Sequence, residues 1–218
     1  MIRRVLGPLR KLILLLAVLM VGLSLLYIVV TPPSTLILGR WLSLKSVERH
    51  VVPIEEISPN LRLMVIASED GQFCRHNGID WDQVRIVIET GARRGASTIP
   101  MQAAKNVFLW PQRSYVRKAL EVPLAMWLDL IWSKRRMLEI YLNVVEWDEG
   151  VFGAEAAARH YFDKSASALT QREAALLATA LPSPLTRNPG RPSANHARLA
   201  ERLAARAAQS GPIAACVD

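Results

Sequence analysis

The sequence predicts a mainly α-helical protein with one apolar N-terminal segment long enough to span a membrane. Apolar residues recur at helical spacing along most of the chain, and almost no stretch alternates apolar with polar residues as a half-buried strand would. Serine, threonine or aspartate stands where several helices are expected to begin. Beyond its apolar segment, a chain of 218 residues can bury one core of ordinary size, so we expect one folded domain.

The residues from Leu12 to Val30 form an uncharged apolar run. A helix rises about 1.5 Å per residue, so this run nearly matches a hydrocarbon core about 30 Å thick, and we interpret it as a transmembrane anchor. A cleaved signal peptide is the alternative, but the run is longer than a usual signal-peptide core. The preceding residues 1–11 are basic, which predicts an N-terminus in the cytoplasm and the remaining chain on the other side.

Residues 31–60 are expected to form a juxtamembrane segment. Prolines end the first helix, and the apolar stretch from Leu36 to Leu44, which contains Trp41, suits the membrane interface. Ser58 and Pro59 then offer an N-cap and a first helical residue. Glu69 should therefore fall at or just past the C-terminus of this helix, within a folded domain that we take as residues 61–218.

The next helices are expected to flank a loop at residues 91–95. Asp80 and Gln83 have capping-box spacing, which predicts a helix from Trp81 to about Thr90. After the loop, Ser97 is expected to cap a helix from Thr98 to about Phe108.

The second half of the chain continues the helical pattern. A long apolar period runs from Tyr115 to about Asn143, and Pro123 should kink this helix or split it in two. Thr170 and Glu173 form a capping-box pattern before a helix that reaches Leu181. The last helix, residues 195–209, has an apolar face for packing.

The composition favours some partners over others. A formal net charge of +8 suits an anionic partner, either anionic lipid or a phosphorylated substrate. Most of the six tryptophans lie among apolar residues rather than along a basic stripe, which argues against nucleic acid. Cys74 and Cys216 are far apart in the sequence and too few for a disulfide scaffold or a zinc site, so they decide nothing.

Three polar clusters carry the chemistry: Glu69 to Asp80, Gly95 to Asn106, and Arg117 to Glu121. The first combines adjacent carboxylates with glycines, a composition that a packed helix has little use for. Paired carboxylates and fixed cations are what a reaction at a sugar diphosphate requires. Together the clusters predict a glycosyl-transfer enzyme.

These clusters resemble motifs of the family 51 glycosyltransferases, in order and spacing. The matching segments are E-D-x-x-F-x-x-H-x-G-I-D from Glu69, G-A-S-T-I-P-M-Q-A-A-K-N from Gly95, R-K-A-L-E from Arg117, K-R-R-M-L-E-I-Y-L-N from Lys134 and G-V-F-G-A-E-A-A-A-R-H-Y-F from Gly150. The resemblance covers about Leu61 to Pro184 and is closest to monofunctional biosynthetic peptidoglycan transglycosylases. It implies a lysozyme-like helical fold and the polymerisation of lipid II into glycan strands at the bacterial inner membrane, with the catalytic domain in the periplasm.

Two glutamates are candidates for catalysis. Glu69 is our choice for the general base that takes a proton from the attacking sugar hydroxyl, a role that suits a carboxylate of raised pKa. The alternative is that it only solvates a helix end, where a carboxylate is disfavoured. Glu121 is interpreted as assisting the leaving group through cations or a bound metal, and its alternative is a surface pair with Arg117.

The remaining candidates would bind substrate. The N-terminus of the helix after Ser97 is expected to offer free amide donors to phosphate oxygens. The resemblance and the local charges together assign substrate binding to Asp70, Ser97, Thr98, Gln102, Lys105, Asn106, Arg113, Arg117 and Lys118. The sequence departs from the family pattern at Ala96, Pro100 and Met101, which puts the local geometry and rate in question.

The resemblance implies no required cofactor, and Mg or Mn at the diphosphate is left open because no metal ligands can be named. The expected partners are lipid II, the growing glycan strand and the inner membrane, with other cell-wall synthesis or division proteins also open. Two other functions compete: a glycan-cleaving muramidase or lytic transglycosylase, which has no use for a diphosphate-binding cation cluster, and a membrane-anchored scaffold of the cell-wall machinery.

Overall fold

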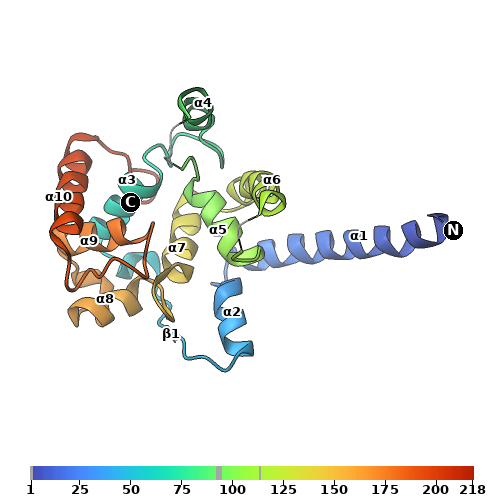
Figure 1. The fold of residues 1–218 in the computed structure, drawn as a ribbon, viewed down its shortest axis with the longest axis horizontal. Helices are drawn as coiled ribbons and strands as arrows, with labels where there is room; N and C mark the ends of the chain where they lie inside the picture. The colour runs from blue at the N-terminus through green and yellow to red at the C-terminus, as the bar shows by residue number, and fades with distance from the viewer. Residues whose placement is uncertain (1, 92–94, 113) are drawn as a thin grey trace.

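The computed structural model describes residues 2–91, 95–112 and 114–218, and this part of the chain is mainly helical, as predicted (Figure 1). Within the described residues, strand structure is limited to one small sheet of order β1-β3-β2. It consists of β1 (Glu48–Arg49), which runs parallel to β3 (Val151–Phe152), and β2 (Glu146–Asp148), which is antiparallel to β3. The predicted loop at 91–95 falls largely on residues 92–94, which lie outside the described ranges.

Helix α1 (Ile2–Leu26) projects away from the body of the protein (Figure 1). Leucine, isoleucine and valine side chains between Leu12 and Leu19 are each at least half exposed. The C-terminal end of α1 is held to the domain: the Trp127 indole donates to Ser24 Oγ at 3.0 Å and the Trp132 indole donates to the Ser24 carbonyl at 2.8 Å. In the described ranges, no helix meets both the length and the hydropathy expected of a membrane span.

Four predicted helices are confirmed, three of them with the predicted caps and the last with a cap, Ser193, that was not predicted. Helix α3 (Pro59–Glu69) is capped by Ser58, α4 (Trp81–Thr90) by Asp80, and α10 (Ala194–Gln209) by Ser193. Helix α9 (Gln171–Ala180) opens with the complete capping box of Thr170 and Glu173. The three predicted caps are local in sequence, which is why the sequence was sufficient to find them.

Two predictions about the central helices were wrong. Helix α5 spans Ile99–Phe108 and is capped by Thr98 rather than by Ser97. The long helical period does divide, but Pro123 lies inside α6 (Tyr115–Ile131), and the break comes at Trp132–Ser133, where Ser133 caps α7 (Lys134–Val144). The long helical period is therefore divided at Ser133, which caps α7, and not at Pro123.

The remaining elements complete two packed layers around a common core. They are α2 (Thr35–Leu42), the short 3-10 helices η1 (Ile54–Glu56) and η2 (Ala166–Ala168), and α8 (Ala154–Phe162). Helix α3 packs on α9 and α10, whereas α5 packs on α6 and α7. Helix α7 is buried along most of its length, including Tyr141 at 0% exposure. The core therefore brings the C-terminal end of α3 to α5.

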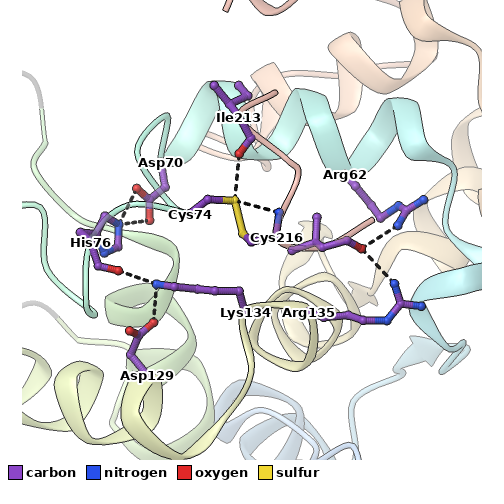
Figure 2. The surroundings of a disulfide bond; sticks show 10 residues. Arg62, Asp70, Cys74, His76, Asp129, Lys134, Arg135, Ile213 and Cys216 are labelled. Atoms are coloured by element: carbon purple, nitrogen blue, oxygen red, sulfur yellow. Dashed lines mark hydrogen bonds and ion pairs between the residues drawn. A yellow bond between two sulfur atoms is a disulfide. The ribbon is translucent and has the colours of Figure 1, made fainter. Parts of the chain in front are cut away.

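A disulfide joins the loop after α3 to the C-terminal segment. Cys74 and Cys216 are bonded across 142 residues, a pairing that the sequence analysis did not predict (Figure 2). The joined segment is also held through Val217, whose carbonyl accepts hydrogen bonds from Arg62 at 3.0 Å and Arg135 at 2.9 Å. On the other side of the loop, the Lys134 ammonium donates to the His76 carbonyl at 2.7 Å (Figure 2). The loop next to Glu69 is therefore fixed from two sides.

Replacing both cysteines, Cys74→Ser with Cys216→Ser, should lower the free energy of unfolding by about 2 to 5 kcal/mol, because the cross-link restricts the unfolded chain over a long loop. Chemical denaturation of the variant and the oxidised protein measures this difference. Wild-type protein reduced with dithiothreitol is the control and should unfold with the variant. Equal stability of oxidised wild type and the double variant would show that the cross-link contributes nothing.

Candidate active site

Glu69 lies at the last position of α3, where the helix meets the disulfide-linked loop. Its carboxylate accepts a hydrogen bond from Ser68 Oγ at Oε1 and from Gln102 Nε2 at Oε2, both at 3.0 Å. Burial raises the pKa of Glu69, and the two hydrogen bonds and the Lys105 charge partly offset this rise. The result is a carboxylate of raised pKa held in one orientation, which is the state a general base needs.

Gln102 reaches Glu69 from the first half of α5. The other end of its amide is also engaged, because the Tyr141 hydroxyl of α7 donates to Gln102 Oε1 at 3.0 Å. Contact of Gln102 with substrate stays a prediction, and no motif in the sequence gives Tyr141 a role. Within the described residues, the amide of Gln102 is committed to the base on one side and to a buried tyrosine on the other.

Asp70 braces the junction between α3 and α5. Its carboxylate is 5% exposed, accepts from the Ile99 amide at 2.9 Å and faces the His76 ring nitrogen at 2.8 Å (Figure 2). The three groups belong to the end of α3, the start of α5 and the loop between α3 and α4. Contact of Asp70 with substrate stays a prediction, whereas its position makes it a support for Glu69.

The N-terminus of α5 does not present the free amides expected for phosphate. The Ile99 amide donates to Asp70, Pro100 has no amide proton, and the Met101 amide donates to Thr98 Oγ1 at 3.3 Å. The Gln102 amide begins the helical pattern by donating to the Thr98 carbonyl. Thr98 is buried and its hydroxyl donates to the Gly78 carbonyl at 2.6 Å. The expected dipole site is thus already satisfied by the protein itself.

Glu121 is buried between two cations of its own helix rather than exposed. It is 3% exposed, with Arg117 paired to Oε1 and Lys118 donating to Oε2 at 2.9 Å. The Lys118 ammonium also donates to Ser97 Oγ at 2.8 Å. This cluster links α6 to the segment before α5, and it replaces the exposed-pair alternative with a buried network.

The charges of both Glu69 and Glu121 act on the pKa of Lys105. Burial lowers its pKa, and Arg117 and Lys118 lower it further, whereas the negative charges of Glu121 and Glu69 act in the opposite direction. Its ammonium makes no hydrogen bond or ion pair with any residue in the described ranges. Lys105 is therefore a largely buried cation that the described residues leave without a partner, and its contact with substrate stays a prediction.

Two cavities meet at Gln102. The first, of about 550 Å³, is lined by Glu69, Asp70, Ser97 and Thr98 among others, and the second, of about 260 Å³, by Lys105 and Asn106. Sequence reasoning missed several charged residues that line them, including Arg75 in the first cavity. Arg206 of α10 lines the first cavity, and Glu146 of β2, whose pKa is raised by burial, lines the second. Both come from segments outside the motifs, so no local signal marked them.

Some site predictions are not brought to these cavities. Arg117, Lys118 and Glu121 do not line either cavity in the described ranges, although Lys118 touches Ser97, which does. Arg113 lies outside the described residues.

A search for related proteins decides the family. The family model described as transglycosylase matches residues 37–209. The chain belongs to the transglycosylase family. Proteins named biosynthetic peptidoglycan transglycosylase from Brucella suis and Rhizobium meliloti are each 50% identical to it, over 95% and 94% of this chain and 95% and 88% of theirs. A protein of the same name from Rhodopseudomonas palustris is 52% identical over 85% of this chain and 84% of its own.

Resident metal binding finds little support in this transglycosylase domain. Both oxygens of Glu121 are paired with cations, and Asp70 is engaged with Ile99 and His76. Within the described ranges, no group of three or more His, Cys, Asp and Glu is arranged to hold a metal ion. The carboxylates of Glu121 and Asp70 are therefore already engaged by protein groups and do not fit the role of metal ligands.

Replacing Arg117 with methionine should destabilise the transglycosylase domain by about 3 kcal/mol, because the buried Glu121 carboxylate would lose its better-buried partner. Urea denaturation with circular dichroism measures the loss. The matched control is Arg117→Met with Glu121→Leu, which removes both charges and should regain most of the stability. If the single variant lost less than about 1 kcal/mol, the pair would behave as an exposed one.

Proposed function

We propose that this chain polymerises lipid II into β-1,4-linked glycan strands during cell-wall synthesis and releases undecaprenyl diphosphate. The family match and the names of its relatives support peptidoglycan transglycosylation as the reaction class. The observation that carries the proposal is the buried Glu69 carboxylate, of raised pKa and held by Gln102 at 3.0 Å, with the Lys105 ammonium, which no described residue pairs, lining the adjoining cavity. We also infer that the helical domain is lysozyme-like, in keeping with its mainly helical content.

In the proposed reaction, the 4-hydroxyl of one GlcNAc attacks C1 of the MurNAc that carries the diphosphate. Glu69 takes the hydroxyl proton while the new glycosidic bond forms. The bond from C1 to the phosphate oxygen breaks, and its electron pair leaves with undecaprenyl diphosphate, so the configuration at C1 inverts. A base with a pKa nearer to neutrality than that of an ordinary glutamate takes this proton more effectively and is still ionised at working pH.

The leaving group needs its developing charge neutralised more than it needs a proton. Lys105 is the cation best supported for this role, because no described residue satisfies its ammonium and it lines the second cavity. We propose that Glu121 holds Arg117 and Lys118 near the departing diphosphate and does not donate a proton. Arg113 and a divalent cation carried in with the diphosphate remain part of the proposal, and the latter is tested by adding a chelator to the assay.

Glu69→Gln should abolish glycan synthesis from purified lipid II, by at least about 10²-fold, because the base is lost while the shape is kept. Gel analysis of labelled glycan measures the product, and an unchanged melting temperature shows that the fold survives. Glu173→Gln is the control, since Glu173 caps α9 and pairs with Lys164 away from the cavities.

The same assay separates the competing functions. Shortening of added glycan would favour a lytic enzyme, and no reaction of the wild-type protein would favour a scaffold. Glu69→Gln activity within about tenfold of wild type would remove Glu69 from the mechanism.

The reaction places the protein in the cell envelope, and we further propose that residues 12–30 lie in the inner membrane with the catalytic domain in the periplasm. Exposed apolar side chains on α1 support this, because they have no protein surface to cover them. The disulfide between Cys74 and Cys216 supports an oxidising compartment for the domain. The basic residues 1–11 favour a cytoplasmic N-terminus.

Deleting residues 1–19 should strongly slow polymerisation of lipid II in vesicles but leave the rate in detergent nearly unchanged, because the anchor confines enzyme and substrate to one surface. This deletion keeps Ser24 and its contacts with Trp127 and Trp132, so the domain should stay folded. Replacing residues 12–19 with eight leucines is the matched control and should keep the vesicle rate. Equal vesicle rates for all three proteins would limit the segment to a role outside catalysis.

A further inference from the structure

Tyr141 places a hydroxyl group in the centre of the core, next to the candidate active site. Its side chain is 0% exposed and lies on α7. A buried hydroxyl costs free energy unless it makes a hydrogen bond, so a phenylalanine would suit packing alone. The partner of this hydroxyl is Gln102 Oε1, at 3.0 Å.

The contact determines which end of the Gln102 amide faces the base. Burial raises the pKa of Tyr141 well above its ordinary value, and the nearby Glu69 and Asp70 charges add to this, so the phenol keeps its proton. It therefore donates to the amide oxygen, which turns the amide nitrogen toward Glu69 Oε2 at 3.0 Å. The reversed amide would point its oxygen at an ionised carboxylate, which accepts hydrogen bonds but donates none.

We infer that Tyr141 is a positioning residue that acts through Gln102 to hold a hydrogen-bond donor on Glu69, keeping this base ionised and fixed in direction. The inference rests on the proposed function, in which Glu69 is the base. Tyr141 touches neither cavity, so it does not act on substrate directly. Its effect reaches the reaction only through the Gln102 amide.

Other groups also act on Glu69 and set the background against which Tyr141 works. Ser68 donates to the other carboxylate oxygen. Lys105 of α5 favours the ionised form and Asp70 opposes it. Other charged or titratable groups lie near the junction. Arg75, Asp80 and Arg206 line the same cavity, His76 pairs with Asp70, and the Arg117, Lys118 and Glu121 cluster lies on α6. None of these contacts the Tyr141 hydroxyl, so Tyr141→Phe leaves them in place.

Tyr141→Phe should lower kcat/KM for lipid II by about three- to tenfold below neutral pH and less at alkaline pH. A base works only when deprotonated, and activity falls as pH drops through its pKa. Weakening a donor to the carboxylate raises that pKa, so the acidic limb of the pH profile should move upward by about half to one pH unit. Binding of a phosphoglycolipid mimic should be unchanged, because the leaving-group cations are intact.

Two controls separate positioning from packing. Tyr161→Phe also removes a hydroxyl that is hydrogen-bonded, to the Trp147 carbonyl and Asp148, but this tyrosine is not in contact with the base. It should leave the acidic limb in place. In a Gln102→Ala background, Tyr141→Phe should cause no further loss, because the residue through which it acts is gone.

A direct readout keeps this inference distinct from the proposed function. Carboxyl-carbon NMR of Glu69 in the folded protein reports its pKa without substrate, and Tyr141→Phe should raise that pKa. Failure of the wild type to use lipid II would overturn the proposed function and leave this measurement valid. A melting temperature that falls with no change in the pKa of Glu69 or in the acidic limb would reduce Tyr141 to a packing residue and overturn the inference.

Discussion

The site depends on the hydrogen bonds of the buried Asp70 carboxylate. This carboxylate receives the first amide of α5 and a nitrogen of His76, and it follows directly after the base in the chain. A buried charge is tolerated only when its partners are in place, so the end of α3 and the start of α5 cannot separate without a large cost. Glu69 and Gln102 meet because the bond between Asp70 and the Ile99 amide joins their two helices. Asp70 is one residue from Glu69, and Ile99 is three residues from Gln102.

The hydrogen bond between Asp70 and the start of α5 also affects which groups can offer positive charge to the site. Since Asp70 and Thr98 use the amides at the start of α5, the helix N-terminus is not left for phosphate. In the proposed mechanism, side-chain cations take its place, and they are divided between two arrangements. Arg117 and Lys118 are held by Glu121, whereas Lys105 stays without a described partner at the second cavity. A flexible ammonium can follow a diphosphate as it departs, which a helix end cannot do.

Local signals in the sequence predicted α3, α4 and α9, since each begins with a cap that is encoded within four residues, whereas α10 was predicted from its apolar face. The start of α5 was displaced by one residue because Ser97 and Thr98 are both good caps. What distinguishes them is distant: Lys118 binds Ser97, and Gly78 receives the Thr98 hydroxyl. Gly78 itself needs its positive φ, and a Cβ there would lie 2.9 Å from the backbone of α6.

The candidate site shows the same division between local and distant information. Glu69, Glu121 and Lys105 could be named from motifs, because their chemistry is visible in their residue types. The partners that tune them could not, because Tyr141 is 39 residues from Gln102 and the hydroxyl looks like one more member of an apolar helix. The burial of Glu121 was equally hidden, since spacing on α6 predicts a pair with Arg117 but not whether water reaches it.

The disulfide has a consequence for how the protein matures. Cys74 leaves the ribosome 142 residues before Cys216, so the loop beside Glu69 must wait, untied, through the synthesis of everything between them. If the domain crosses the membrane as proposed, with residues 1–11 left in the cytoplasm, Cys74 enters the oxidising space before Cys216 and could pair there with the wrong thiol. Because the chain contains just these two cysteines, a wrong disulfide could form only with another molecule. The loop beside Glu69 would be cross-linked late, once the segment that carries Cys216 has also arrived.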